Sequence, residues 1–145
     1  MKIKYEKKNK VGVRQINFYK EEKYKKNDSG KDYFLNFKVE KDLNRRKFIL
    51  LVRSVIDRVK KHKQEKISFD YSQVKDIFVE DLSDYDRAKI FVENLFIGEY
   101  KFDKYLSKKE GRISEIIIFG DFNSEEKKAF AEAEIVSLGV NQARD

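Results

Sequence analysis

Apolar and polar residues alternate along several stretches of the chain, a pattern typical of β-strands with one buried face. The first two stretches, residues 2–8 and 10–18, are separated by Asn9, so we predict two strands joined as a hairpin. Residues 33–39 alternate more regularly and predict a third, half-buried strand. Residues 67–71 carry Ile, Phe and Tyr at every second position and predict a fourth strand.

Two later segments change to the apolar spacing of three and four residues that is typical of amphipathic helices. Apolar residues recur at that spacing from about residue 42 to residue 59. The basic run 60–63 follows and suits the negative end of a helix dipole, so we predict a helix that ends there. A second helix is predicted to begin at Ser83, which has the position of an N-cap, and to end near Gly98.

The apolar run 116–119 has no alternation, which indicates a strand covered on both faces. A third helix is predicted after it, with Asn123 or Ser124 as its N-cap and Glu126 at the capping-box position of Asn123. Two opening strands, followed by strands and helices in alternation, predict an α/β fold. We expect a three-layer domain with a central mixed β-sheet and flanking helices.

Composition narrows the class of protein. The chain has 145 residues, which fits a single domain spanning residues 1–145. It has no cysteine, which excludes disulfides and cysteine-based zinc sites. No apolar run approaches the ~20 residues that span a bilayer, and no apolar leader follows Met1. We therefore expect a cytoplasmic protein that does not bind a membrane.

The net charge of +7 is concentrated near the N-terminus. Residues 1–26 contain ten Lys and Arg and three Glu, which accounts for the whole excess. A solvated surface and a nucleic-acid-binding surface would use the same charges. Because Arg14 is the only arginine in this segment, and arginine is favoured for bidentate phosphate recognition, we favour the solvated surface.

Side chains that could support catalysis are few. His62 is the only histidine and lies in a Lys-rich helix end, so we expect it to be a solvated surface residue. Carboxylates at the two later helix starts are explained by the positive end of the helix dipole. These carboxylates are Asp81, Asp84, Asp86, Glu125 and Glu126. We predict no catalytic, cofactor-binding or metal-binding residue in this chain.

Two local features leave binding functions open. The six glycines are scattered and form no phosphate-binding loop, although Gly120, between a strand and a helix, has the place where a nucleotide-binding sheet puts such a loop. Tyr100–Tyr105 interleaves aromatic and basic residues, as in modules that stack nucleic-acid bases. The alternative for this stretch is that its aromatic side chains anchor the end of the second helix to the core.

The same stretch carries a resemblance to a known family. Gly98 is followed by Glu-Tyr-Lys-Phe-Asp-Lys-Tyr-Leu-Ser-Lys, at the end of a helix that begins near residue 85. An Ala-rich helix from Ala129 leads later to Ala143-Arg144-Asp145. Over residues 85–109 and 129–145 the chain resembles the N-terminal domain of the leucyl (cytosol) aminopeptidase family of metallopeptidases.

This resemblance implies a macro-domain-like fold and a role as a non-catalytic N-terminal accessory domain. The parent enzyme would remove N-terminal residues from peptides with two divalent metal ions, zinc or manganese, held by a catalytic domain expected after Asp145. That catalytic domain and other copies in a hexamer would be the partners, and the domain would support assembly or access to the active site. No enzyme activity is expected for this chain alone.

Two alternative functions remain. One is a nucleic-acid-binding module that uses residues 1–26 and the aromatic side chains of Tyr100–Tyr105. The other is a macro-like domain that binds ADP-ribose or another nucleotide.

Overall fold

The structure is a computed structural model that describes residues 1–20, 34–40, 43–78, 81–99 and 112–144. The described strands form one five-stranded sheet in the order β1-β5-β4-β2-β3. The strands are β1 (Lys2–Glu6), β2 (Arg14–Tyr19), β3 (Phe34–Lys38), β4 (Lys66–Asp70) and β5 (Glu115–Phe119). The helices are α1 (Arg45–Lys61), α2 (Tyr71–Ile77), α3 (Asp84–Glu99) and α4 (Ser124–Arg144).

All four pairings among the described strands are parallel, so the predicted mixed sheet is wrong. The predicted hairpin is wrong for the same reason, because β5 and β4 lie between β1 and β2. The turn signal itself is real: Gly12 has a φ of 86°, and the amide of Val13 donates to the carbonyl of Lys10. That turn leads the chain into β2 instead of pairing β2 with β1.

The connection from β1 to β2 is short for parallel strands, which usually need a dozen or more residues. Residues 7–13 must return from the carboxyl edge to the amino edge of the sheet and pass two strands. That path is about 21 Å, from ~16 Å along a strand and ~14 Å across three strand spacings. Seven extended residues reach about 24 Å, so the segment crosses directly with no helix. We refer to residues 7–13 as the crossing segment.

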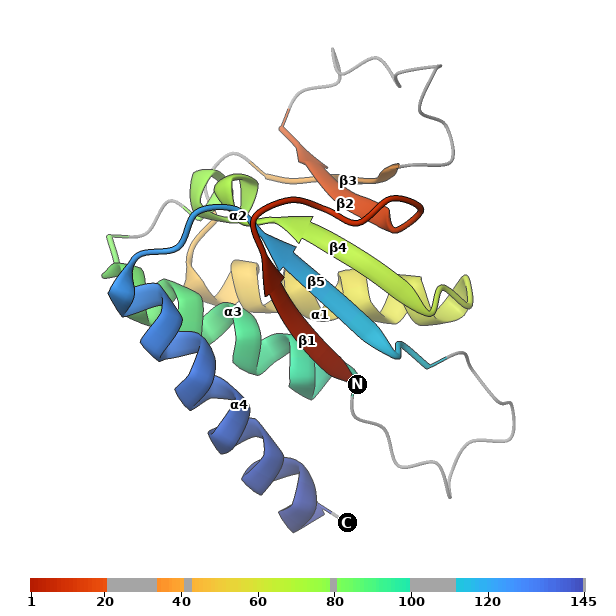
Figure 1. Cartoon of the computed structure of the whole chain (residues 1–145). Coiled ribbons are helices and arrows are strands. Elements are labelled where there is room, and N and C mark those ends of the chain that lie inside the picture. The colour runs from red at the N-terminus through yellow and green to blue at the C-terminus, as the bar shows by residue number, and fades with distance from the viewer. Residues whose placement is uncertain (21–33, 41–42, 79–80, 100–111, 145) are drawn as a thin grey trace.

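The central sheet with its flanking helices confirms the predicted α/β fold. In Figure 1 the sheet lies in front of α1 and α3, and the crossing segment passes in front of the sheet. The three long helices contact the same face of the sheet: α1 contacts β3, α3 contacts β4, and α4 contacts β1. The contacting pairs are Phe37 with Arg58, Phe69 with Phe91, and Tyr5 with Phe130.

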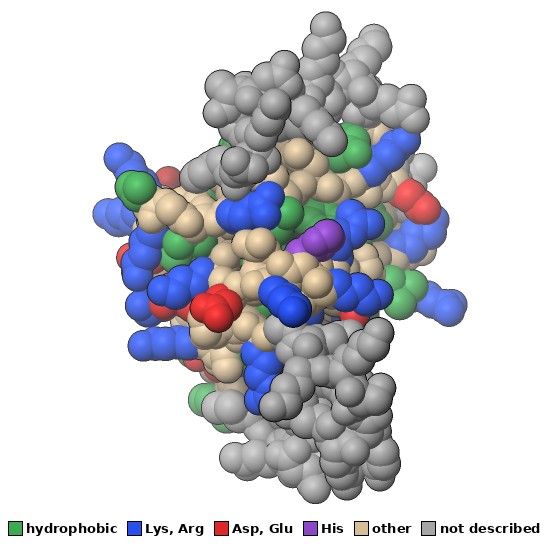
Figure 2. Space-filling view, turned by 90° about the vertical axis from the view of Figure 1, so that its right-hand side faces the viewer, with side chains coloured by type: hydrophobic (Ala, Val, Ile, Leu, Met, Phe, Trp, Pro, Cys, Tyr) green, Lys and Arg blue, Asp and Glu red, His purple; other side chains and the backbone are tan. Residues whose placement is uncertain are grey.

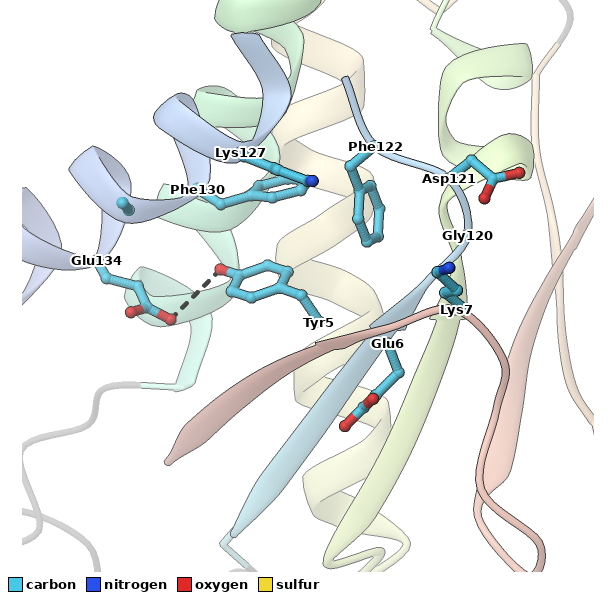
Figure 3. A pocket seen from close by; sticks show the side chains of 10 residues that line it. Tyr5, Glu6, Lys7, Gly120, Asp121, Phe122, Lys127, Phe130 and Glu134 are labelled. Carbon is cyan, nitrogen blue, oxygen red and sulfur yellow. Dashed lines mark hydrogen bonds between the residues drawn. The ribbon is translucent and has the colours of Figure 1, made fainter. Parts of the chain in front are cut away.

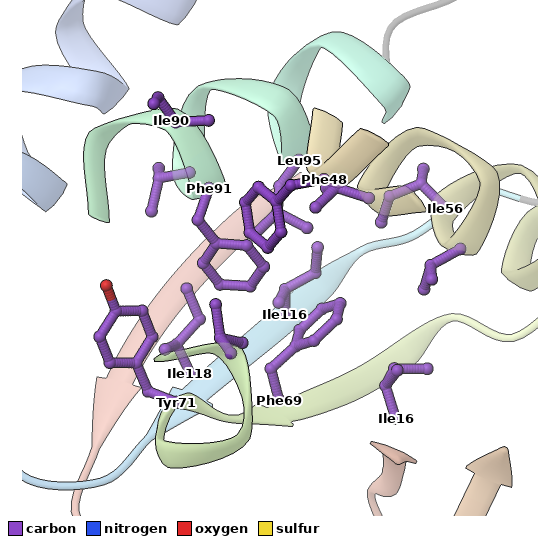
Figure 4. Packing of buried hydrophobic residues seen from close by; sticks show 14 of the residues in the cluster. Ile16, Phe48, Ile56, Phe69, Tyr71, Ile90, Phe91, Leu95, Ile116 and Ile118 are labelled. Atoms are coloured by element: carbon purple, nitrogen blue, oxygen red, sulfur yellow. The ribbon is translucent and has the colours of Figure 1, made fainter. Parts of the chain in front are cut away.

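The core lies between that sheet face and the helices. Phe91 of α3 is fully buried and contacts the rings of Phe48, Phe69 and Tyr71 (Figure 4). Within the predicted apolar strand 116–119, residues 116–118 are fully buried and Phe119 is half-buried, which fits β5 in the interior of a sheet. Burial of such large apolar side chains is the main favourable contribution to folding.

Helix α2 was not predicted. Tyr71 continues the alternation of Ile67 and Phe69, so sequence reasoning extended the strand through it. In the structure, β4 ends at Asp70, whose carboxylate accepts hydrogen bonds from the amide and the hydroxyl of Ser72. Asp70 therefore acts as an N-cap and starts a helix one residue before the alternation ends.

The other helix starts are close to their predicted positions. Asn44 caps α1 by accepting from the amide of Lys47, and Ser83 caps α3 by accepting from the amide of Asp86. Gly98 does not end α3 but lies inside its last turn, where a Cβ would be 3.3 Å from that of Ile56. A glycine there allows α1 and α3 to approach closely. Among the described helices, none has the length and apolar character needed to cross a membrane.

Candidate small-molecule site

The carboxyl ends of β1 and β5 lie side by side, and the chain leaves them in opposite directions. β1 continues into the crossing segment in front of the sheet, whereas β5 continues through residues 120–123 into α4. In open parallel sheets, ligands bind in the crevice where neighbouring strands send their connections to opposite faces. A pocket of about 540 Å³ lies at this position, a volume in the range of small-molecule sites.

We refer to this cavity as the β1–β5 pocket, and Figure 3 shows it. Its wall is contributed by the end of β1, the loop after β5 and the side of α4 that faces β1. The residues that line it are Tyr5, Glu6, Lys7, Gly120, Asp121, Phe122, Lys127, Phe130, Ala131 and Glu134.

Three aromatic rings form the apolar part of the pocket. Tyr5 and Phe130 are stacked, with ring centroids 4.6 Å apart and planes at 14°. Phe122 meets Phe130 edge to face, with centroids 5.1 Å apart. Phe130 is almost fully buried, so the wall is tied to the core, while Tyr5 and Phe122 are partly exposed toward the pocket. Such a wall can bind the apolar part of a ligand.

Tyr5 and Glu134 connect this aromatic wall to a carboxylate. The Tyr5 hydroxyl of β1 donates to the Glu134 carboxylate of α4 at 3.3 Å. Burial raises the pKa of the Tyr5 hydroxyl well above its ordinary value, and the nearby Glu134 charge adds to the effect. Burial also raises the pKa of the Glu134 carboxyl, with a smaller opposing effect from the Tyr5 hydrogen bond. The pair therefore keeps its hydrogen bond at neutral pH.

We expect Glu134→Gln to raise the melting temperature at pH 8 and to change it little at pH 4. The folded state holds the Glu134 proton more tightly than the unfolded chain, whose ordinary Glu pKa is about 4.3. Native stability therefore falls as the pH rises from ~4.3 through the raised folded pKa, and glutamine removes that loss. Thermal melting followed by circular dichroism from pH 4 to pH 8 measures it. A difference in melting temperature between Glu134→Gln and the unchanged protein that is the same at every pH would contradict the raised pKa of Glu134. The control is Glu125→Gln, at an exposed position.

Charges of both signs surround the aromatic wall. Glu6 and Asp121 are exposed carboxylates at the strand ends, and Lys7 and Lys127 are exposed ammonium groups. In Figure 3 the Lys127 ammonium points toward Phe122, while Glu134 lies beyond the Tyr5 ring, at the other end of the wall. The site therefore offers hydrogen-bonding partners for an anionic group and for a cationic group of one ligand.

The phosphate-binding position suggested by Gly120 is filled by the chain itself. Gly120 has a φ of 142°, a conformation that favours glycine, and follows β5 as predicted. Helix α4 begins next, but its N-terminus is closed by a capping box. The amide of Asn123 donates to the Glu126 carboxylate at 2.9 Å, and the amide of Glu126 donates to the Asn123 side chain at 2.8 Å. A bound phosphate would have to displace the Glu126 carboxylate.

The remaining predicted residues lie elsewhere. His62 is exposed at the C-cap of α1, as expected for a solvated surface residue. Asp84 and Asp86 occupy the first turn of α3, and Glu125 and Glu126 that of α4, which confirms their predicted positions at helix starts. Asp81 is exposed just before α3.

The basic segment 1–26 does not form one surface where it is described. Lys7 and Lys20 lie near the carboxyl edge of the sheet, whereas Lys2 and Arg14 lie at the amino edge. Residues 21–26 and the aromatic stretch Tyr100–Tyr105 lie outside the described residues.

Sequence reasoning pointed to this site only through Gly120. Tyr5 has the pattern of an ordinary half-buried strand residue, and Phe130 and Glu134 have that of an ordinary amphipathic helix. No local signal indicates that residue 5 lies beside residues 130 and 134, because that proximity comes from the pairing of β1 with β5.

Comparisons with known proteins identify no family: no family model and no curated protein matches the chain. The leucyl-aminopeptidase resemblance therefore stays a prediction. Within the described residues, no three His, Asp or Glu side chains are grouped closely enough to hold a metal ion.

Proposed function

We propose that this chain is a non-catalytic accessory domain that binds a small zwitterion with a large apolar side chain, such as phenylalanine or leucine. The observation that supports this is the β1–β5 pocket, which combines an aromatic wall with charges of both signs. A ligand with an ammonium, a carboxylate and an apolar group can use all three features at once.

The expected arrangement follows from the positions of the charges. The apolar side chain of the ligand lies against Phe122 and Phe130, its carboxylate near Lys127, and its ammonium near Glu134. A ligand of about twelve non-hydrogen atoms, at roughly 0.3–0.5 kcal/mol per atom, gives a Kd on the order of 0.04–2 mM. Binding in this range suits sensing of a free metabolite.

The predicted accessory role gives this binding a context. An enzyme of the leucyl aminopeptidase family would release free amino acids, so an adjoining domain that binds an apolar amino acid would meet the product. The proposal rests on the pocket and does not require the resemblance. As part of the same proposal, the partners of this chain are the catalytic domain of that enzyme and other copies of the protein in a hexamer.

A matched set of ligands tests the charge pattern. We expect the amide NMR signals of Tyr5, Gly120 and Lys127 to shift on titration with L-phenylalanine. With 3-phenylpropionate, which lacks the ammonium, and with phenethylamine, which lacks the carboxylate, the shifts should saturate only at a ligand concentration at least several-fold higher. Lys127→Gln should weaken phenylalanine binding several-fold because a charge-assisted hydrogen bond is lost.

The control variant is Lys128→Gln, which removes the same charge from the neighbouring exposed position outside the pocket. It should bind phenylalanine as the unchanged protein does. Equal loss in both variants, or no shifts with 10 mM phenylalanine or leucine, would refute the proposal. Saturable binding of ADP-ribose at the same signals would favour the nucleotide alternative instead.

A further inference from the structure

The amino ends of the strands carry a second feature, which lies at the opposite edge of the sheet from the β1–β5 pocket. The backbone ties these ends together: the amide of Lys2 donates to the carbonyl of Ser114, and the amide of Ser114 donates to that of Glu65. Basic residues gather there from separate parts of the chain. We name this surface the basic edge and define it by Lys2, Lys10, Arg14, Lys63, Lys66 and Arg112.

Figure 2 views the molecule from this side, with His62 near the centre of the face. Lys and Arg side chains spread across the visible surface and clearly outnumber the acidic ones. The C-terminal turn of α1 adds Arg58 and Lys61, of which Lys61 pairs with Asp57 at 3.2 Å. The surface is therefore positive over several elements.

Ordinary helix stabilisation explains only part of this charge. Arg58 and Lys61 lie in the last turn of α1, where cations offset the helix dipole. Lys2 and Lys66 begin strands, whose small dipoles give cations no comparable stabilisation, and the nearby carboxylate of Glu115 is already paired with Lys4. The accumulation at the strand ends calls for an anionic partner.

The effect of these cations is visible on Glu115, a nearly buried carboxylate at the start of β5. The Lys4 ammonium contacts it at 2.8 Å and lowers the pKa of the Glu115 carboxyl, against the opposing effect of burial. The charges of Lys10 and Lys66 lower it further. Lys10, from the crossing segment, is thereby close to the strand ends although it precedes β2.

The composition of the basic edge favours a nucleic acid over a protein or a membrane. Protein interfaces are depleted in lysine at their centres and enriched in aromatic residues and methionine. Membrane insertion would rely on Val11, the only large apolar side chain near this edge that is fully exposed among the described residues. One valine contributes about 1.5–3 kcal/mol at most when buried. Separate lysine ammonium groups, by contrast, each suit one phosphate.

We propose that the basic edge binds the phosphate backbone of a nucleic acid without reading its sequence. This function goes beyond the binding of a small zwitterion, since the two sites lie at opposite edges of the sheet. It also differs from a surface built on residues 1–26, because the cations come from four separate segments and Lys7 and Lys20 are not among them.

Binding of the full chain to a fluorescein-labelled 20-base-pair duplex DNA, followed by anisotropy, tests the proposal. About four phosphate contacts predict a slope of log K against log salt near −3.6. Lys63→Gln combined with Lys66→Gln should make the slope less steep by about 1.8 and weaken binding at least ~10-fold at 100 mM salt. Lys89→Gln combined with Lys128→Gln, on α3 and α4, removes the same charge and should leave binding within about twofold.

Several outcomes overturn the proposal. No binding of DNA at 50 mM salt would refute it directly. Equal loss of binding in both double variants would leave only the net charge of the protein as an explanation. Tighter binding of poly-glutamate than of DNA would assign the edge to an acidic protein. Binding of vesicles with ~30% phosphatidylserine that is lost in Val11→Asp, with none of DNA, would assign it to a membrane. Thermal melting of each variant separates lost binding from lost folding, and the phenylalanine titration should be unchanged in all of them.

Discussion

Replacing Phe91 with alanine is expected to lower the free energy of unfolding by about 3–5 kcal/mol. The ring is fully buried at the centre of the interface between α3 and the sheet. It lies edge to face with Phe69, at 5.2 Å and 85°, and contacts Phe48 and Tyr71 as well. Alanine would remove these contacts and leave a cavity that the packed neighbours cannot fill. Urea unfolding followed by circular dichroism measures the change.

Two variants control for this result. Phe91→Leu keeps most of the apolar volume and should cost clearly less than Phe91→Ala. Ile135→Ala removes an apolar side chain that is 71% exposed and should change stability by no more than about 0.5 kcal/mol. A Phe91→Ala cost below about 1 kcal/mol would show that α3 does not pack on β4 as described.

Glu126→Ala is expected to lower the free energy of unfolding by about 3 kcal/mol, the second largest effect. Glu126 is fully buried, accepts from the amide of Asn123 through one oxygen, and has the other 3.2 Å from the ammonium of Lys75. That second contact has the distance of an ion pair without hydrogen-bond alignment. Alanine leaves the Asn123 amide and the Lys75 charge without their partner, so two polar groups lose their compensation.

Glu126→Gln should cost less than Glu126→Ala because the amide oxygen can still accept from Asn123. The neighbouring Glu125→Ala removes an exposed carboxylate from the same helix turn and should cost only about 0.3–1 kcal/mol. A double-mutant cycle with Lys75→Met isolates the ion pair, and we expect a coupling of about 1 kcal/mol. Equal effects of Glu125→Ala and Glu126→Ala on urea unfolding would contradict the buried capping box.

Local chemistry was predictable from the sequence wherever its partners are close along the chain. The capping box of Asn123 and Glu126 spans four residues, and the structure contains both of its hydrogen bonds. The buried strand 116–119 was predicted because a strand in the sheet interior needs apolar residues on both faces. These elements are specified by the residues that form them.

Strand order was not predictable in this way. Asn9 and Gly12 predict a turn, and a turn is present, but whether β2 pairs with β1 depends on what else can occupy that place. β5 supplies a more apolar neighbour for β1 than β2 does, and no local pattern reports that competition. The β1–β5 pocket follows from the same long-range pairing, so its residues were missed together.

The pairing of β1 with β5 also sets the order in which the molecule can be assembled. Residues 2–6 are synthesised well before residues 115–119, which are their neighbours in the sheet. Until β5 exists, β1 has no native strand to pair with, and long-range parallel pairing is slow to form. Once β5 has formed, its outer edge stays unprotected until β1 docks on it. The β1–β5 pocket is therefore complete only when β1 has docked on β5 and brought Tyr5 to its wall, and a ligand held there would favour that docking.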